Sequence, residues 1–305
     1  MLRLTFVHSL LDAIVNRIRR LLLPYLIRRA DKIYPPLKGS YVRRLTAGSV
    51  LKATDTYRLR PEVDAMQFLS RQGIPIPVPR LIDYWEADGE GKLVMEYIEG
   101  KQLLRAWRDL TAEQRIHVMR TLARYVDVLR AIPQPPAPAL APSGWVGSAT
   151  GGAFTDGKVT WSEVPLGPFC DQAAFNVWHY SLFAKYEKWS PKVPAYLAEL
   201  RRATRDDHPI VFTHGDMHMA NVLIRVHGEG PEDVEVVALL DWEQSGWRPL
   251  YWEAMKWIWM SRGGNLMAPW KEFGWKELCV GYDQDVMREF QLMEVSTTPP
   301  YVEDS

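Results

Sequence analysis

The spacing of hydrophobic positions predicts strands up to residue 97 and mainly helices after residue 102. In four short stretches up to residue 97, apolar and polar residues alternate, which is the period of β-strands. The predicted strands are residues 41–45, 49–52, 81–85 and 92–97. Short glycine-containing turns join the first two and the last two, so each pair is predicted to form a hairpin. From about residue 102 the apolar positions recur at helical spacing, most regularly over 112–131. The pattern predicts an α+β chain, with a small antiparallel sheet followed by a larger, mainly helical part.

One helix is predicted between the two hairpins. Ala65, Met66 and Leu69 continue a helical repeat that starts at Glu62, and Pro61 suits the first turn of a helix. Glu62 therefore stands at the start of this helix, ten residues after Lys52.

The first 30 residues carry an amphipathic, basic pattern. Six arginines are interspersed with apolar residues at helical spacing, and Asp12 is the only acid. Pro24 is expected to kink or end this helix. Three interpretations stay open: a helix packed across the N-terminal lobe, an organelle-targeting presequence, and contact with a membrane surface. The expected location is the cytoplasm, with mitochondria as the alternative that a presequence would imply.

Composition excludes several classes of function. The 305 residues contain 37 basic and 37 acidic side chains, so nothing global indicates a nucleic-acid partner. Cys170 and Cys279 lie far apart, which argues against a disulfide framework and a zinc site. No stretch is long and apolar enough to predict a membrane span. The sequence gives no indication of oligomeric state.

Proline, glycine and serine mark the expected boundaries. Residues 34–40 are predicted to be a linker, 73–79 a polyproline-like strip, and 132–169 a long irregular stretch. The chain is predicted to consist of an N-terminal extension over 1–38, an N-lobe over 39–98, a C-lobe over 99–293, and a flexible tail over 294–305.

The candidate chemistry lies in two neighbouring motifs. Residues 214–221 read His-Gly-Asp-Met-His-Met-Ala-Asn, which places Asp216 and Asn221 in one tight loop. An apolar run then ends in Asp241. Phosphoryl transfer needs a carboxylate to deprotonate an attacking hydroxyl, and an amide with a second carboxylate to hold Mg²⁺ on the nucleotide phosphates. These three side chains fit those needs.

Together the motifs resemble the aminoglycoside phosphotransferase and choline kinase superfamily, which has a two-lobed protein-kinase-like fold. The resemblance rests on His-Gly-Asp with Asn221, on Asp241-Trp242-Glu243, and on Lys52 followed by Glu62, and it covers roughly residues 40–260.

The resemblance implies a role for each site residue. Asp216 would be the catalytic base, and Asn221 and Asp241 would coordinate Mg²⁺ on ATP. Lys52, oriented by Glu62, would contact the phosphates. The other implied positions are the backbone of Glu96, Tyr97 and Ile98 at the adenine edge, His214 as a brace of the loop, and Glu243, which would approach the metal through water or hold the loop.

The expected acceptor is a hydroxyl or amino group of a small molecule. A tryptophan-rich helix follows soon after Asp241, which leaves no room for the long activation segment with which protein kinases dock polypeptides. The tryptophans could hold a quaternary ammonium group, or they could be core residues.

The family covers the ATP phosphates with a glycine-rich loop, the phosphate clamp, and this chain has few glycines where that loop is expected. Only Gly39 and Gly48 precede Lys52, so either a short hairpin or residues 1–40 would form the clamp. If neither does, nucleotide binding is impaired. A catalytically weak binding or scaffold protein and an atypical protein kinase are therefore the alternatives.

Overall fold

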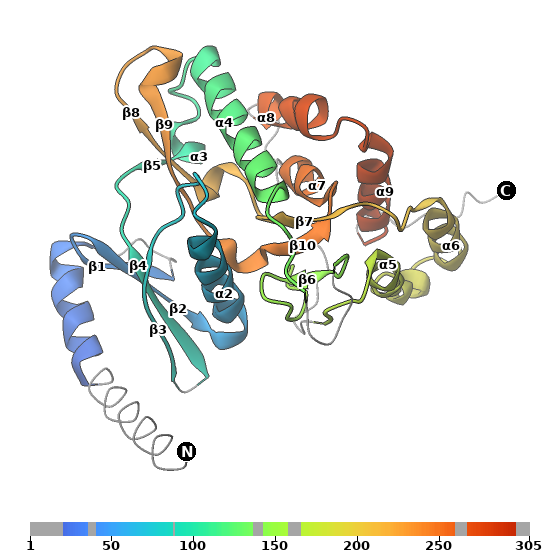
Figure 1. Cartoon of the computed structure of the whole chain (residues 1–305), viewed down its shortest axis with the longest axis horizontal. Coiled ribbons are helices and arrows are strands. Elements are labelled where there is room, and N and C mark those ends of the chain that lie inside the picture. Colours follow the sequence, from blue (N-terminus) through green and yellow to red (C-terminus); the bar gives the residue numbers. More distant parts are fainter. Residues whose placement is uncertain are drawn as a thin grey trace.

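The chain folds into two lobes, a small one built on an antiparallel sheet and a larger, mainly helical one (Figure 1). The computed structural model describes residues 21–35, 41–87, 89–136, 143–157, 166–259 and 267–296. This architecture confirms the predicted fold class.

The N-lobe sheet has four strands in the order β1-β2-β4-β3. The strands are β1 (Val42–Thr46), β2 (Ser49–Asp55), β3 (Leu81–Ala87) and β4 (Glu90–Glu96). All four predicted strands are thus present. β2 is longer than predicted, so Lys52 lies in the middle of the strand rather than at its end, opposite Val42 of β1 and Leu93 of β4.

Helix α2 (Thr56–Gln72) begins four residues before Arg60, from which the sequence predicts a helix, so Glu62 lies on its second turn rather than at its beginning. Pro61 is inside the helix. Proline has the helical φ, but inside a helix it removes one backbone hydrogen bond and its ring crowds the carbonyl four residues earlier, so the buried face of α2 must offset this cost. Glu62 belongs to the buried face of α2, next to Val63 and Met66.

The C-lobe begins with short elements and one long helix. These are β5 (Lys101–Gln102), α3 (Leu103–Ala106) and α4 (Ala112–Arg130). The last matches the predicted helix 112–131. Thr111 and Gln114 form a capping box at its start, which satisfies two backbone donors reciprocally. The irregular stretch that follows contains only β6 (Gly147–Ser148) as a named strand among its described residues.

The rest of the C-lobe alternates helices and short strands. First come α5 (Gln172–Ser181), η1 (Ala184–Lys188) and α6 (Val193–Ala203). The site-bearing region comprises β7 (Ile210–Thr213), η2 (Met219–Asn221), β8 (Val222–Val226), η3 (Pro231–Asp233), β9 (Val234–Leu239), η4 (Trp242–Gln244) and β10 (Gly246–Pro249). The final helices are α7 (Trp252–Trp259), α8 (Ala268–Phe273), the π-helical turn η6 (Gly274–Leu278) and α9 (Asp283–Glu294).

Two three-stranded sheets organise this region, in the orders β6-β10-β7 and β5-β8-β9. β7 leads into the His-Gly-Asp motif and β9 leads to Asp241. The two motifs therefore follow strands that belong to different sheets.

Aromatic side chains fill the C-lobe core. Trp242, Trp247, Trp252 and Trp257 are each at most 1% exposed. Trp257 stacks on Trp270 with ring centroids 3.9 Å apart. Of the two interpretations of the tryptophans, core packing is therefore the one that the burial supports.

Part of the basic N-terminal segment is helical. Residues 21–33 form a helix that continues through Pro24, so the proline does not end it. Leu23 and Ile27 of this helix, together with Leu51 and Ala53 of β2, line a cavity of about 220 Å³ between helix and sheet. This agrees with the interpretation of a helix packed on the N-lobe. The predictions for residues 1–20 lie outside the described residues.

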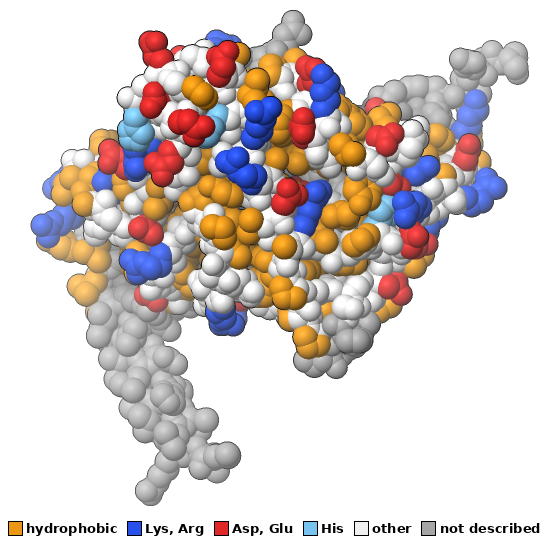
Figure 2. Space-filling model, turned by 45° about the horizontal axis from the view of Figure 1, so that its top comes forward, with side chains coloured by type: hydrophobic (Ala, Val, Ile, Leu, Met, Phe, Trp, Pro, Cys, Tyr) orange, Lys and Arg blue, Asp and Glu red, His pale blue; other side chains and the backbone are white. Residues whose placement is uncertain are grey.

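The surface, the cysteines and the C-terminal end can be compared with what the sequence predicts. In the part of the chain that the structure describes, no helix is long and apolar enough to cross a membrane. Positive and negative side chains are interspersed on the face drawn in Figure 2. Cys170 and Cys279 are free thiols. Helix α9 reaches Glu294 and Val295 is buried, whereas residues 297–305 of the expected tail lie outside the described residues.

Candidate functional site

The loop between β7 and η2 requires a glycine at residue 215. Gly215 has φ +74°, in the region that side chains rarely adopt, and a Cβ there would lie 2.5 Å from the carbonyl oxygen of Gln244. Only glycine lets the loop lie this close to η4. The arginine that protein kinases carry at this point of the motif could not replace it here.

Asp216 and Asn221 are held together by hydrogen bonds. The Asn221 Nδ2 amide donates to Oδ2 of Asp216 and to the Asp216 carbonyl, both at 3.0 Å. Because both amide hydrogens go to Asp216, the Asn221 Oδ1 atom points away from that residue and is available as an acceptor or ligand. His218 lies beside the pair, with Nε2 3.5 Å from Oδ2 of Asp216. The structure thus brings together the predicted base and the predicted amide ligand.

His214 links the catalytic loop to the end of β9. The Asp216 backbone N–H donates to Nδ1 of His214 at 3.2 Å, so Nε2 carries the hydrogen and donates to the Leu240 carbonyl at 3.0 Å. Burial lowers the pKa of His214, against the opposing field of Glu253 and Asp216, which favours this neutral form. Both ring nitrogens are engaged, as expected for a bracing residue.

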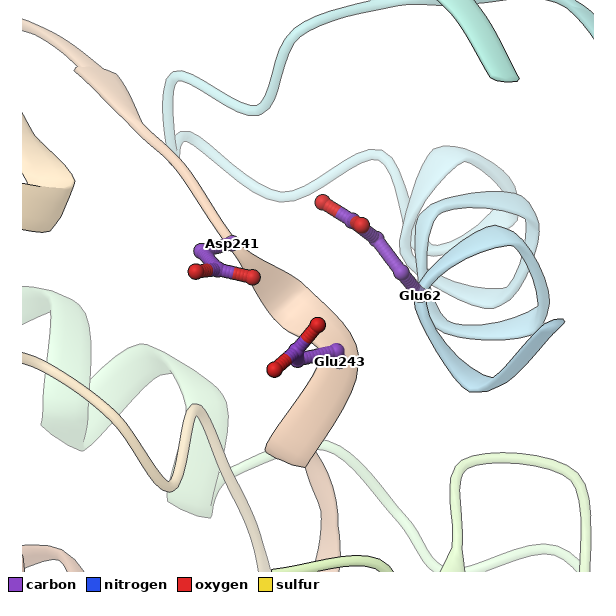
Figure 3. Close-up of side chains that lie close together, drawn as sticks. All are labelled: Glu62, Asp241 and Glu243. Atoms are coloured by element: carbon purple, nitrogen blue, oxygen red, sulfur yellow. The ribbon is translucent and has the colours of Figure 1, made fainter. Parts of the chain in front are cut away.

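Three carboxylates converge beside this loop. Glu62 comes from α2, Asp241 from the end of β9 and Glu243 from η4, and one oxygen of each lies within 4.8 Å of the others (Figure 3). Asp241 has φ +65°, the only positive φ of a non-glycine residue among the described residues. Such strain concentrates at functional sites, where the surroundings hold the backbone in place.

The Lys52 ammonium group lies within this carboxylate cluster. Its Nζ atom is 2.7 Å from Glu62, 2.9 Å from Asp241 and 3.6 Å from Glu243. Burial opposes the charge on Lys52, but the three carboxylates outweigh it and raise the pKa of this lysine. The ion pair with Glu62 that the sequence predicted is present, and Asp241 shares the same cation.

The carboxylates respond to burial in the opposite direction. Desolvation raises the pKa of Glu62, against the pull of Lys52. Desolvation and the repulsion of Asp241 raise the pKa of Glu243 to about 7. A cation in addition to Lys52 would relieve the repulsion between these groups.

The segment predicted to meet the adenine edge, residues 96–98 and here called the hinge, begins at the end of β4. The Glu96 N–H donates to the Arg80 carbonyl at 2.9 Å, and the Tyr97 N–H donates to the Gly48 carbonyl at 3.0 Å. These two donors are therefore used within the protein. Of the three predicted hinge positions, Ile98 becomes the expected backbone donor to a base.

The hairpin turn between β1 and β2 is at the hinge end of the sheet. The Gly48 carbonyl accepts the hydrogen bond from the Tyr97 N–H, and Ser49 of β2 is paired with Glu96 of β4. Lys52 lies at the other end of the register, opposite Val42. A phosphate clamp near Lys52 would thus come from the chain that precedes Val42 and not from the turn. Residues 36–40, which include Gly39, lie outside the described residues.

Comparison with known protein families decides the assignment. The model of the phosphotransferase enzyme family matches residues 39–290, which is most of the chain. The chain belongs to the phosphotransferase enzyme family. This confirms the resemblance to aminoglycoside phosphotransferases. The matched residues include all ten residues to which the resemblance gives a role.

Solved structures of this family have the same fold. The chain is 20% identical to aminoglycoside phosphotransferase APH(3'')-Id from Streptomyces rimosus, in complex with ADP and streptomycin, with a TM-score of 0.52 over 90% of this chain and 97% of that one. Aminoglycoside 2'-phosphotransferase-IIIa, in a GDP complex, is 12% identical, with a TM-score of 0.54 over 85% of this chain and 80% of that one. No curated protein matches the sequence.

The candidate site includes one acid to which the sequence analysis gave no role. Glu253 of α7 accepts hydrogen bonds from the backbone N–H groups of His214, at 2.6 Å, and Gly215, at 3.1 Å. It is 1% exposed. An acid inside the apolar sequence Tyr-Trp-Glu-Ala-Met is unusual enough to have signalled a buried partner.

A second buried contact supports the loop from below. Lys256 of α7 contacts Asp156 at 2.8 and 2.9 Å and the Gln244 side-chain oxygen at 2.8 Å. Both charged side chains are fully buried. This contact joins α7 to the irregular stretch and to the η4 residue that lies over Gly215.

Proposed function

We propose that this phosphotransferase moves the γ-phosphate of ATP, with Mg²⁺, to a hydroxyl or amino group of a small molecule. The observation that carries the proposal is the 2.9 Å contact between Lys52 of the N-lobe and Asp241 of the C-lobe, because it unites the nucleotide-orienting and metal-holding groups at one point. That point adjoins the loop that holds Asp216 and Asn221.

Asp216 is the proposed base. Its carboxylate is nearly fully buried and is oriented by the Asn221 amide. It accepts the hydrogen of the attacking group as the new bond to phosphorus forms, and ADP leaves with the bridging oxygen. The buried, hydrogen-bonded carboxylate is suited to orient the acceptor in line with the phosphate.

The oxygen ligands near Asp241 fit a magnesium ion. Carboxylate and amide oxygens are the ligands that Mg²⁺ prefers, and Asn221 Oδ1 and Asp241 would hold it, with Glu243 close enough to assist. The ion, when bound, would neutralise charge on the β- and γ-phosphates. Lys52, held by Glu62, would contact the same phosphates.

The nucleotide is expected between the hinge and this cluster. Related structures of the same fold contain ADP or GDP, which supports a purine nucleotide as donor. In this chain the base would meet the backbone at Glu96, Tyr97 and Ile98, with Ile98 supplying the donor.

A small acceptor is supported by the short connection after Asp241. Only η4 and β10 separate this residue from α7, which begins at Trp252. No element in that connection could present a polypeptide. The aminoglycosides bound by related proteins share the hydroxyl and amino groups that the proposal requires, but the low identity does not transfer a particular acceptor.

A first experiment separates an enzyme from a scaffold. We expect Mg²⁺ with ATP to raise the melting temperature of the protein more than ATP alone, because metal and nucleotide bind one site. Absence of any stabilisation by Mg-ATP would support the catalytically weak scaffold instead.

A second experiment tests the chemistry and the base. Hydroxylated and amino small molecules are screened for ADP release, and Asp216→Asn should lower turnover by about 10²- to 10⁴-fold while Mg-ATP stabilisation persists. Asp109→Asn, at an exposed aspartate paired with Lys101, is the matched control and should retain full turnover. Full turnover by Asp216→Asn would refute the assignment of the base. ADP release only with a protein acceptor would establish an atypical protein kinase.

A further inference from the structure

The helix formed by residues 21–33 has two different faces. One face turns to the sheet: Leu23 and Ile27 line the cavity against β2, and Ala30 is 3% exposed. Asp31 anchors this face through a 2.7 Å contact with Arg43 of β1. The helix is therefore fixed on the N-lobe and does not need its other face for packing.

The other face is apolar and uncovered by the described residues. Its apolar side chains are between 47% and 71% exposed. They are Leu21, Leu22, Tyr25, Leu26 and Ile33. Leu22, Leu26 and Ile33 follow one another at spacings of four and seven, so they lie along one stripe of the helix. A helix surface that only faces water has no physical reason to carry such a stripe.

Every charge on this outer face is positive. Arg28, Arg29 and Lys32 are exposed, whereas Asp31 is engaged by Arg43. The sequence extends the bias, because residues 1–35 hold seven basic and two acidic side chains out of 37 of each. The segment thus carries a net charge of +5 and the rest of the chain a net charge of −5.

We propose that the exposed face of helix 21–33 binds the surface of an anionic lipid bilayer. Leucines and a tyrosine flanked by cations are the combination that an interfacial helix uses, since the apolar groups enter the acyl boundary and the cations meet the headgroups. Because its apolar stripe lies along one side of the helix and the opposite side packs on the sheet, the helix would lie in the plane of the interface. A second copy would bring a face of equal positive charge against this one, which makes it the poorer occupant.

The orientation leaves the candidate site open. Leu51 and Ala53 of β2 face the helix, and Lys52 between them points to the opposite face of the sheet, toward Glu62. Figure 1 shows the helix on the side of the sheet away from the C-lobe. Docking through this helix would therefore hold the protein at the membrane without covering the candidate site around Lys52 and Glu62.

Vesicle flotation with the full chain tests the proposal. We expect the protein to float with vesicles of phosphatidylcholine and phosphatidylserine, to stay behind with phosphatidylcholine alone, and to be released by high salt. Arg28→Gln with Arg29→Gln should lower the partition coefficient roughly 30-fold, since each cation near an anionic surface contributes roughly fivefold.

Leu22→Glu with Leu26→Glu should abolish flotation, and the melting temperature should stay at the wild-type value because both leucines are exposed. Val177→Glu, at an exposed valine of α5, is the matched control and should float like the wild type.

Three results would overturn the proposal. They are absence of flotation with anionic vesicles, equal flotation with both lipid compositions, and a dimer in sedimentation analysis that the Leu22→Glu, Leu26→Glu variant dissociates. The last would mean that a second copy covers this face.

Discussion

At the scale of single residues, Lys52 connects the two lobes. Its hydrogen bond to Glu62 lies within the N-lobe, whereas its hydrogen bond to Asp241 joins the N-lobe to the C-lobe. Binding of a metal by Asp241 would have to compete with this second bond. The same ammonium group is therefore both a nucleotide ligand in the proposed mechanism and a structural cation in the free protein.

Replacement of Lys52 tests the structural part of this role. Lys52→Met leaves the buried Glu62 carboxylate without its cation, and breaking a buried pair in this way costs about 3–5 kcal/mol. We expect the free energy of unfolding in urea to fall by that order. Lys101→Met, which removes the lysine of an exposed pair with Asp109, should leave it unchanged. Equal effects of the two substitutions would show that the cluster does not depend on Lys52.

At the scale of elements, helix α7 supports the catalytic loop from beneath. Glu253 holds the backbone of His214 and Gly215, and one turn further Lys256 holds Asp156 and Gln244. A helix with two buried charged residues thus fixes both the loop and the segment that faces it. The polar contacts of α7 position the loop, and its tryptophans pack the core.

The Lys256–Asp156 pair is open to a double-mutant cycle. Lys256→Met alone removes the cation that contacts the buried Asp156 carboxylate and should lower the free energy of unfolding by about 3–5 kcal/mol. Asp156→Asn added to it removes the charge that Lys256 compensated and should restore part of that loss, which gives a coupling energy above about 0.5 kcal/mol. Urea unfolding of the two single variants and the double variant measures it. Strictly additive losses would mean that the two residues act independently.

At the scale of the whole molecule, the sequence predicted what local periodicity and motif spacing encode. The four N-lobe strands and helix α4 followed from such patterns, and the resemblance to the family implied the pairing of Lys52 with Glu62. The contact of Lys52 with Asp241 was not predicted. The start of α2 did not follow from such a pattern. A proline usually marks the first turn of a helix, but Pro61 lies inside α2.

The sequence did not indicate contacts that only tertiary packing creates. Glu253 meets His214 across 39 positions, and Lys256 meets Asp156 across 100. Neither partner is marked by a local repeat. What the sequence did contain was the anomaly of two charges in an apolar helix, which indicates that partners exist without naming them.

Protonation of a buried C-lobe pair should couple stability to pH. Burial raises the pKa of Glu289 to about 7, although a hydrogen bond from Tyr251 lowers it. Burial also lowers the pKa of His179 to about 3, and its Nδ1 lies 3.7 Å from Glu289. The folded state therefore binds more protons at Glu289 than the unfolded state does, and fewer at His179. The first effect makes stability fall as pH rises from about 4.5 to 7, and the second makes it rise from about 3 to 6.5, so the two oppose each other in the wild type.

Glu289→Gln separates these two effects. The glutamine keeps an oxygen for the Tyr251 hydroxyl but cannot ionise, so the variant loses the fall in stability that Glu289 causes. Relative to the wild type, its free energy of unfolding should improve by up to about 3 kcal/mol between pH 4.5 and pH 7.5. Urea unfolding at both pH values measures the difference, with Glu199→Gln on the exposed side of α6 as the control that should show none. A gain of the same size at both pH values would show that Glu289 does not titrate in this window and that the buried pair carries a fixed charge.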